Sequence, residues 1–197
     1  MTMDIVIARY NESLLWYSAV MVGPRKVVYN KGEGELRPLP NIGREAHTYL
    51  HHILETYPEF PDWTFFTQGN PIDHCPNFVD IVNKWPASQS KCALYVSTGQ
   101  MFFSNHPVLF FEADPTTGDD AENDCRSLWN ELFASDLDDH PVFAPGAIFA
   151  ISKERLHSRS WQFYKRAYEL AASRPRAPWE FERLWAYLWT SSAATKL

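Results

Sequence analysis

Polar side chains follow directly after an aromatic, strand-like run in the first half of the chain. Residues 63–66 are mainly aromatic, and Gly69 and Pro71 then turn the chain. Such a run can be buried in a sheet, and open α/β sheets bind their ligands just beyond the carboxyl ends of their strands. We therefore expect the polar residues of this turn to line a crevice, although an ordinary exit from a strand would give the same pattern. They are Gln68, Asn70, Asp73 and His74.

The elements that would position this turn alternate between strands and helices. Apolar residues at intervals of three and four predict a helix over residues 43–57, with Asn41 as its cap and Pro58 as its stop. The alternation predicts one α/β domain, residues 1–197, with a mixed, mostly parallel sheet flanked by helices. The expected strands are 4–9, 25–29, 62–67, 93–97 and 145–152. The other expected helices are 14–16, 78–85, 125–133, 153–156, 161–172 and a last one from Pro178.

Composition narrows the class of protein. The 197 residues are 45% apolar and 15% aromatic, which is enough to build a globular core without disulfides or structural metals. A net charge of −6 leaves no general basic field, so nucleic acid is not an expected partner. We expect a reducing, cytoplasmic location, because the three cysteines are widely spaced and the amino terminus lacks a signal-peptide pattern. We expect no transmembrane segment, because the sequence lacks a long apolar run.

Five sequence blocks are spread along nearly the whole chain. They are Val6-Ile-Ala-Arg-Tyr-Asn-Glu12, Leu39-Pro-Asn-Ile-Gly-Arg-Glu-Ala-His-Thr-Tyr-Leu50, Phe66-Thr-Gln-Gly-Asn-Pro71, Pro145-Gly-Ala-Ile-Phe-Ala-Ile-Ser-Lys-Glu-Arg155 and Phe181-Glu-Arg-Leu-Trp185. Together they resemble a family of largely uncharacterised fungal, bacterial and algal-virus proteins. In order and spacing they are also similar to compact GT-A-type glycosyltransferases, which are built on a Rossmann-like sheet. The resemblance implies transfer of a sugar from a nucleotide donor, with residues 1–85 as the nucleotide-sugar-binding half and 86–197 as the acceptor side.

The first two blocks imply a donor site. Tyr10, Asn11 and Glu12 resemble the turn that holds the nucleoside, and their amide, carboxylate and ring suit a base or ribose. The open alternative is that Asn11 or Ser13 caps a short helix. A helix that starts at Gly43 and Arg44 offers free N–H groups and a guanidinium to a diphosphate. Lys31, which follows the second expected strand, is counted with Gln68 and Asn70 among the donor-binding residues.

The third block departs from the pattern that it resembles. The resemblance implies two acids that hold Mn²⁺ or Mg²⁺ against the diphosphate, but residues 68–70 are Gln-Gly-Asn. Asp73 is then the expected metal ligand, and His74 beside it would favour Mn²⁺. A metal-independent enzyme whose loop binds the donor directly is the open alternative. A literal acid pair, Asp136 and Asp138, lacks a preceding strand and is interpreted as a solvated acidic loop.

The last block implies a catalytic base. Glu182 is expected to take the proton from an acceptor hydroxyl in an inverting transfer, with Glu180 as the near alternative. Acids in the first turn of a helix are also favoured by its dipole alone. His51 and His52 are interpreted as structural or surface residues, because neighbouring helical residues point about 100° apart and cannot easily share one metal site. His47, one turn after Arg44, is interpreted as a packed or solvated helix residue, with a functional role as the open alternative.

The favoured function is therefore a glycosyltransferase that uses a UDP-type nucleotide sugar and a hydroxyl acceptor on a glycan, with help from a divalent metal. Two alternatives stay open. One is a module that binds nucleotides or carbohydrates without catalysis, which the missing acid pair favours. The other is a metal-dependent hydrolase, for which the sequence lacks ligands at a recognisable spacing.

Overall fold

A computed structural model describes residues 1–21, 23–85, 92–96, 100–104, 111–112, 125–135, 142–143 and 147–189 of the chain. Its strands are β1 (Met3–Arg9), β2 (Arg25–Asn30), β3 (Trp63–Gln68), β4 (Cys92–Val96), β5 (Gln100–Ser104), β6 (Phe111–Glu112), β7 (Val142–Phe143) and β8 (Phe149–Ser152). Its helices are α1 (Arg44–Thr56), α2 (Phe78–Asn83), α3 (Arg126–Phe133), α4 (Lys153–Leu156), α5 (Trp161–Ser173) and α6 (Ala177–Leu188), with short 3-10 turns η1 (Leu15–Ala19) and η2 (Pro71–Asp73).

Within the described residues, the strands form a six-stranded sheet in the order β2-β1-β3-β8-β4-β5 and a separate pair, β6-β7. β1 pairs in parallel with both β2 and β3. β8 runs antiparallel between β3 and β4, and β5 runs antiparallel to β4. The predicted α/β class and mixed sheet are therefore confirmed, and four strands, β2, β1, β3 and β4, point in one direction.

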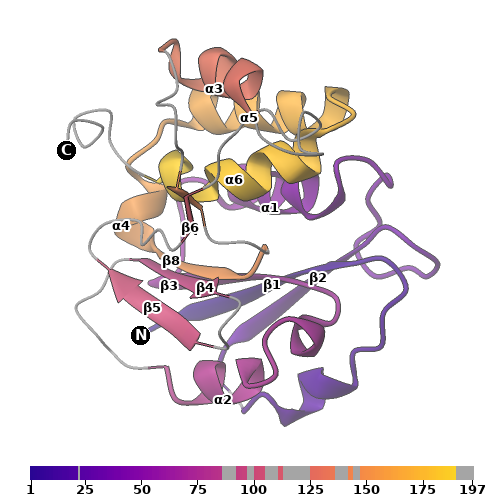
Figure 1. The fold of residues 1–197 in the computed structure, drawn as a ribbon. Coiled ribbons are helices and arrows are strands. Elements are labelled where there is room, and N and C mark those ends of the chain that lie inside the picture. Colours follow the sequence, from indigo (N-terminus) through magenta and orange to yellow (C-terminus); the bar gives the residue numbers. More distant parts are fainter. Residues whose placement is uncertain are drawn as a thin grey trace.

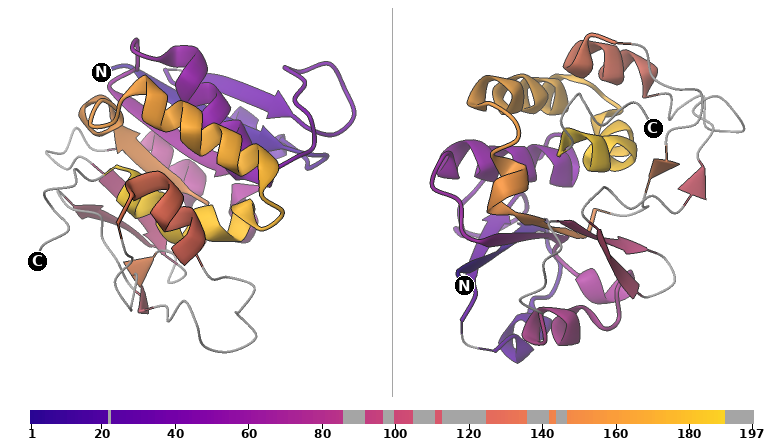
Figure 2. Two further views of the ribbon diagram at one scale, coloured as in Figure 1. Left: turned by 90° about the horizontal axis from the view of Figure 1, so that it is seen from above. Right: turned by 90° about the vertical axis from the view of Figure 1, so that its left-hand side faces the viewer.

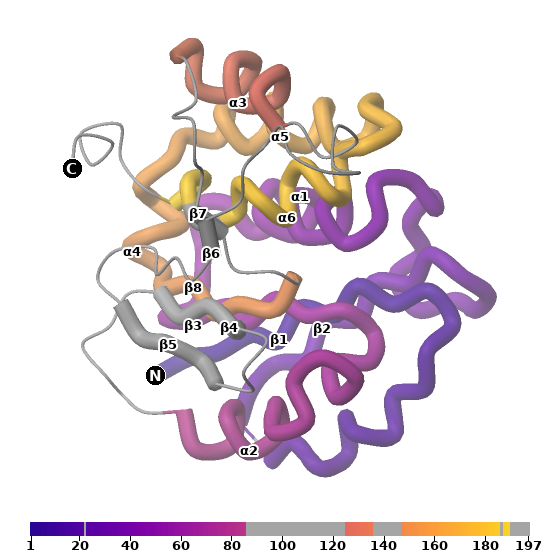
Figure 3. The backbone as a smooth tube through the Cα atoms, viewed as in Figure 1, coloured from indigo at the N-terminus to yellow at the C-terminus, as the bar shows by residue number. Residues whose placement is uncertain are grey.

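Helices cover both faces of this sheet (Figure 1). α1, α3, α5 and α6 lie on one face and α2 on the other. Figure 3 shows that the indigo turn after β1 lies on the same side as α2. Because both faces are covered, neighbouring residues of a strand enter different cores. Val6 packs with the α1 side, whereas Ile5 and Ile7 pack with the α2 side. This explains the continuous apolar run of β1.

The larger core holds three helices together above the sheet. α1, α5 and α6 contact one another pairwise, and Figure 2 shows them side by side from above. Tyr49 of α1 packs its ring on Phe66 of β3, on Phe149 of β8 and on Trp185 of α6. The stripe predicted for the last helix is therefore core, because Phe181, Leu184, Trp185 and Leu188 are all buried.

Two further expectations can be compared with this fold. The helix boundary at residue 43 is confirmed, but Asn41 is not its cap, because Gly43 occupies that position and no side chain caps the helix. Among the described residues, no helix has both the length and the apolar character needed to cross a membrane. Cys75 and Cys125 are buried free thiols.

Candidate functional site

Three neighbouring parallel strands end at one edge of the sheet, where they border a cavity of about 390 Å³. The register pairs Arg9 with Asn30 and Ala8 with Gln68, so the chain leaves β1, β2 and β3 at one level. This is the edge at which open α/β sheets bind ligands. The lining residues are Ala8, Arg9, Tyr10, Glu12, Lys31, Asn41, Arg44, Glu45 and Gln68.

Hydrogen bonds to backbone N–H groups hold the turns after β1 and β2 together. The Lys31 N–H donates to the Arg9 carbonyl oxygen at 2.8 Å, and the Glu33 N–H donates to Asn11 Oδ1 at 3.1 Å. Between them, a Cβ on Gly32 would lie 1.8 Å from the Tyr10 carbonyl oxygen. Only glycine permits this approach, so the position of Tyr10 depends on Gly32.

The turns after β1 and β3 are joined in the same way. The carboxylate of Glu12 accepts a hydrogen bond from the Tyr10 N–H at 2.7 Å and lies against Gly69, whose added Cβ would be 2.3 Å from Glu12 Oε2. The Trp16 indole donates to the Gly69 carbonyl oxygen at 2.8 Å. Glu12 therefore holds the turn after β1 by its hydrogen bond to Tyr10 and packs on the turn after β3 at Gly69. These contacts fix the two turns in the cavity wall.

Arg9 is the cation at the base of this edge. Its guanidinium donates to Asn30 Oδ1 at 2.9 Å and to the Glu12 carbonyl oxygen at 3.0 Å. These are neutral acceptors, so the hydrogen bonds orient the guanidinium without neutralising its charge. Asn30 is buried, and its side-chain amide also donates to the Glu33 carbonyl oxygen at 2.6 Å.

The start of α1 forms the opposite wall. Gly43 and Arg44 both have left-handed backbone angles, with φ values of 57° and 42°. A Cβ on Gly43 would lie 2.3 Å from the Ala171 carbonyl oxygen, so the helix starts in close contact with α5. Arg44 is strained for a residue with a side chain, and such strain is concentrated at functional sites. No side chain at the N-cap position caps α1, and the Glu45 carboxylate accepts a hydrogen bond from its own backbone N–H in the first turn.

Two titratable groups at this wall have shifted pKa values. The Lys31 ammonium donates to the carbonyl oxygens of Ile42 and Arg44, and burial lowers its pKa to about 8, against the opposing effect of Glu45. Burial raises the pKa of Glu45, with a smaller contribution from Glu182, against the opposing effects of its own backbone N–H, Arg44 and Lys31. Lys31 and Glu45 are thus both partly desolvated and lie close enough for each to affect the pKa of the other.

The charges around the cavity favour an anion. Its lining includes Arg9, Lys31 and Arg44 as cations and Glu12 and Glu45 as acids. Cations beside a helix start form a suitable seat for phosphate oxygens.

The structure brings together five of the predicted donor-binding residues. Tyr10, Glu12, Lys31, Arg44 and Gln68 all line the cavity. Sequence reasoning missed three polar lining residues, Arg9, Asn41 and Glu45. Arg9 and Glu45 stand next to predicted residues in the sequence, and that adjacency was the signal available.

The other predicted residues are not among those that line it. Asn11 instead accepts the Glu33 N–H in the adjoining turn, and Asn70 directly precedes η2. Glu182 is half-buried on α6 and lies within electrostatic reach of Glu45. Glu180 is buried and paired with Arg174 through contacts of 2.9 and 2.6 Å. Asp136, Asp138 and Gly146 lie outside the described residues.

The expected metal ligands do not form a cluster in the described part of the chain. Asp73 and His74 are exposed at the end of η2, which turns the chain after β3. No group of three histidine, cysteine, aspartate or glutamate side chains suited to a metal occurs among the described residues. A divalent ion at Asp73 would need most of its oxygen ligands from a phosphate and from water. Metal assistance stays a prediction.

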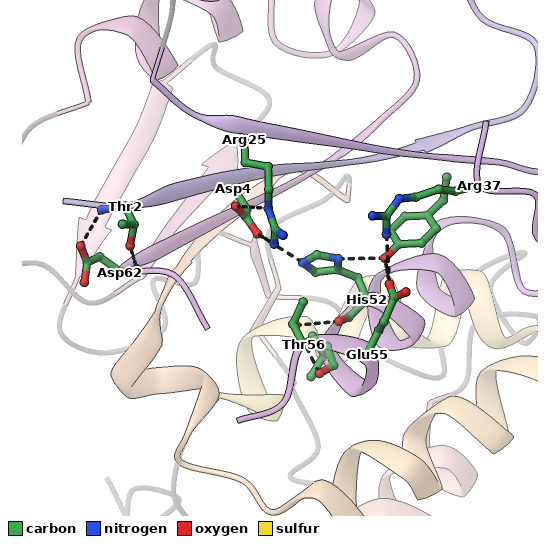
Figure 4. Close-up of polar contacts among 10 residues, drawn as sticks. Thr2, Asp4, Arg25, Arg37, His52, Glu55, Thr56 and Asp62 are labelled. Atoms are coloured by element: carbon green, nitrogen blue, oxygen red, sulfur yellow. Dashed lines mark hydrogen bonds and ion pairs between the residues drawn. The ribbon is translucent and has the colours of Figure 1, made fainter. Parts of the chain in front are cut away.

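A second polar network lies between the sheet and α1, apart from the cavity lining (Figure 4). Asp4 at the start of β1 pairs with Arg25, and His52 Nε2 lies 3.8 Å from Asp4 Oδ2. His52 Nδ1 lies 3.0 Å from the Tyr29 hydroxyl oxygen, and that hydroxyl donates to Glu55. His52 is buried within this network, which agrees with its interpretation as a structural residue.

Comparison with known proteins adds a family but no activity. The model of a family described as "Protein of unknown function (DUF3431)" matches residues 5–195. No curated protein and no solved structure matches the chain.

Proposed function

The chain belongs to this DUF3431 family, and we propose from the site itself that the protein is a glycosyltransferase that binds a nucleotide sugar in the strand-end cavity. The observation that carries the proposal is the cavity where β1, β2 and β3 end, which combines hydrogen-bonding side chains with three cations, two of them at the start of α1. A nucleoside diphosphate needs both kinds of group. The similarity of the sequence blocks to GT-A-type enzymes also supports a nucleotide-sugar donor.

The nucleoside would bind at the turns after β1 and β3. Tyr10 is half exposed, with 51% of its surface accessible, so its ring is available for stacking on a base. Gln68 and Glu12 line the same cavity and can pair with a base edge or with ribose hydroxyls. The contacts of Gly32 and Gly69 fix these turns before a ligand arrives, which reduces the entropy lost on binding.

The diphosphate would bind at the opposite wall. Arg44 can form two parallel hydrogen bonds to phosphate oxygens, and the N–H groups of the first turn of α1 add further donors. The Lys31 ammonium lies within the same wall. An arriving diphosphate would stabilise the charged form of Lys31 and raise its pKa from about 8.

Transfer would then need a base for the acceptor. The acceptor oxygen forms a bond to the anomeric carbon, while the bond from that carbon to the diphosphate oxygen breaks and the diphosphate leaves with the electron pair. The hydroxyl proton goes to the carboxylate of Glu182, which lies within electrostatic reach of Glu45 but does not line the cavity. Arg44 and Lys31 stabilise the negative charge of the departing diphosphate. Glu180 is not assigned this role, because Arg174 holds both of its oxygens.

Thermal unfolding with and without nucleotides tests the binding step. UDP or a UDP-sugar at a hundred times its dissociation constant should stabilise the protein by about 2.7 kcal/mol. Arg44→Ala should abolish most of this stabilisation, whereas Lys84→Ala, which removes an exposed cation just after α2, should preserve it. If UDP, GDP and their sugars give no stabilisation, with or without Mn²⁺, the proposal is wrong.

A binding module without catalysis is the second candidate. The exposure of Asp73 and His74 favours it, because the described cavity then lacks the expected metal ligands. Release of UDP from a bound UDP-sugar separates the two functions. A transferase should release UDP, and Glu182→Gln should slow release while leaving UDP affinity intact. A binding module would retain the UDP-sugar unchanged.

A further inference from the structure

A second pocket adjoins the first and shares Arg44 with it. It has a volume of about 290 Å³ and lies where the start of α1, the end of α5 and the start of α6 meet. Figure 2 shows these three helices packed together on one face of the sheet. The lining residues are Ile42, Gly43, Arg44, Ala172, Ser173, Arg174, Pro175, Pro178 and Trp179.

We propose that this second pocket binds a neutral pyranose of the acceptor, stacked on the indole of Trp179. This inference rests on the proposed function and assigns the second substrate of the same site. Trp179 exposes 42% of its surface although it carries the largest apolar side chain in the pocket wall. A half-exposed aromatic face beside polar groups matches the C–H face and hydroxyl edges of a sugar ring.

The charges of the second pocket differ from those of the first. Arg174 Nη1 lies 2.6 Å from Glu131 Oε1, and Arg174 Nη2 lies 2.6 Å from Glu180 Oε1. Two carboxylates therefore neutralise this cation, so it can offer hydrogen bonds without attracting an anion strongly. The first pocket, with Arg9 and Lys31 bonded to neutral acceptors, suits an anionic ligand better. The two pockets thus select chemically different partners.

Arg44 connects the two pockets. Its guanidinium carbon lies 5.6 Å from the centre of the Trp179 ring, and its side chain also lines the strand-end cavity. Glu182 lies three residues after Trp179 on α6, so the two side chains share one helix face. Glu182 in turn acts on Glu45 of the first pocket. A sugar on Trp179 would therefore lie beside the proposed base and next to the donor.

Labelling the protein with 5-fluorotryptophan allows a test by ¹⁹F NMR. The Trp179 signal is assigned from its loss in Trp179→Phe, and the probes are methyl glycosides of glucose, galactose, mannose and xylose, together with their disaccharides. At least one probe should shift the Trp179 signal in a saturable manner. The Trp161 signal is the control, because Trp161 is 40% exposed on α5 but lines neither pocket described here. Equal shifts at both tryptophans, or no shift at Trp179 with any probe, would overturn the inference.

Kinetics then test the role of the pocket in transfer. With the glycoside that shifts Trp179 as acceptor, Trp179→Ala should raise the acceptor KM about tenfold, equivalent to the loss of one stacking contact. Trp161→Ala, which changes a tryptophan outside both pockets, should leave the acceptor KM unchanged. An unchanged acceptor KM in Trp179→Ala would refute the assignment.

The two proposals fail in different ways. If UDP stabilises the protein but glycosides leave Trp179 unaffected, the donor site stands and the second-pocket assignment is wrong. If a glycoside binds at Trp179 but no nucleotide binds, the pocket is a carbohydrate site and the glycosyltransferase function is wrong.

Discussion

Acidification from pH 7 to pH 5 should destabilise this protein through two buried histidines. Burial lowers the pKa of His52 from 6.5 to about 3, with Arg25 and Arg37 adding to the effect. Burial lowers the pKa of His47 to about 4, with smaller effects from Lys31 and His51. Both groups bind protons more weakly in the folded state than in the unfolded state. Folding stability due to them is therefore present above pH 6.5 and is lost as the pH falls toward these folded values.

The magnitude follows from the two pKa differences. At pH 5 the unfolded histidine is almost fully protonated, while both folded histidines are still mostly neutral. Linkage gives a loss of about 2 kcal/mol for each histidine between pH 7 and pH 5, or about 4 kcal/mol for the pair. Both side chains are almost completely buried, at 1% and 2% exposure, so solvent screening does not reduce the effect substantially. A loss of this size is a large part of the stability of a typical domain.

The structure explains why neither histidine is compensated when it gains a proton. His52 Nε2 faces Asp4, but that carboxylate is already paired with Arg25. His47 Nδ1 is buried without a hydrogen-bond partner in the described structure, and its ring packs on Tyr168 at 4.6 Å between ring centres. A new charge at either position would be poorly solvated.

Urea denaturation at several pH values provides the assay. Wild-type protein should lose about 4 kcal/mol of unfolding free energy between pH 7 and pH 5 from these groups. His47→Phe, which keeps the ring contact with Tyr168, should remove about half of that loss, and His52→Gln should remove a similar part. His74→Gln changes an exposed histidine and serves as the control. If the two buried variants retain the full wild-type pH dependence, the reasoning is refuted.

Three other changes test the shape and charge of the strand-end cavity. Arg44→Gly should be more stable than Arg44→Ala by about 1 kcal/mol in thermal denaturation, because glycine accepts the left-handed backbone. Both variants should lose UDP binding. Equal stabilities of the two variants would argue against backbone strain at Arg44. Gly32→Ala should cost about 1–3 kcal/mol in urea, because its Cβ would collide with the Tyr10 carbonyl oxygen; a neutral effect would mean that the turn relaxes freely. Glu45→Gln should raise the melting temperature at pH 7, because a carboxyl group with a raised pKa loses its stabilising effect as the pH rises through its folded-state pKa. The increase in melting temperature should vanish in acid, and a lower melting temperature at pH 7 would contradict this prediction.

The periodic sequence patterns predicted most of the helices and strands, but they did not predict the relative directions of the strands. The pattern of residues 43–57 predicts a helix, and α1 spans Arg44–Thr56. The apolar run before residue 152 predicts a strand, and β8 spans Phe149–Ser152. Its antiparallel insertion between β3 and β4 was not predicted, because a continuous apolar run is the same pattern in a parallel and an antiparallel strand. The β5 strand was missed as well.

Prediction of the site succeeded where residues directly follow a strand or start a helix. Tyr10 and Lys31 follow β1 and β2, so parallel pairing brings them together. Asp73 and His74 lie further along the turn, and η2 leaves them exposed. Glu45 could not be distinguished in the sequence from an ordinary acid in the first turn of a helix. Its role depends on the approach of α6, which is a tertiary contact.

A crystal structure with bound UDP would test the central claim most directly. We predict that the diphosphate lies at the start of α1, within hydrogen-bonding distance of Arg44 and Lys31, and that the uracil lies beside Tyr10. The same experiment with UDP and Mn²⁺ would show whether Asp73 takes part. A nucleotide bound elsewhere on the protein, with the strand-end cavity occupied only by water, would contradict the account.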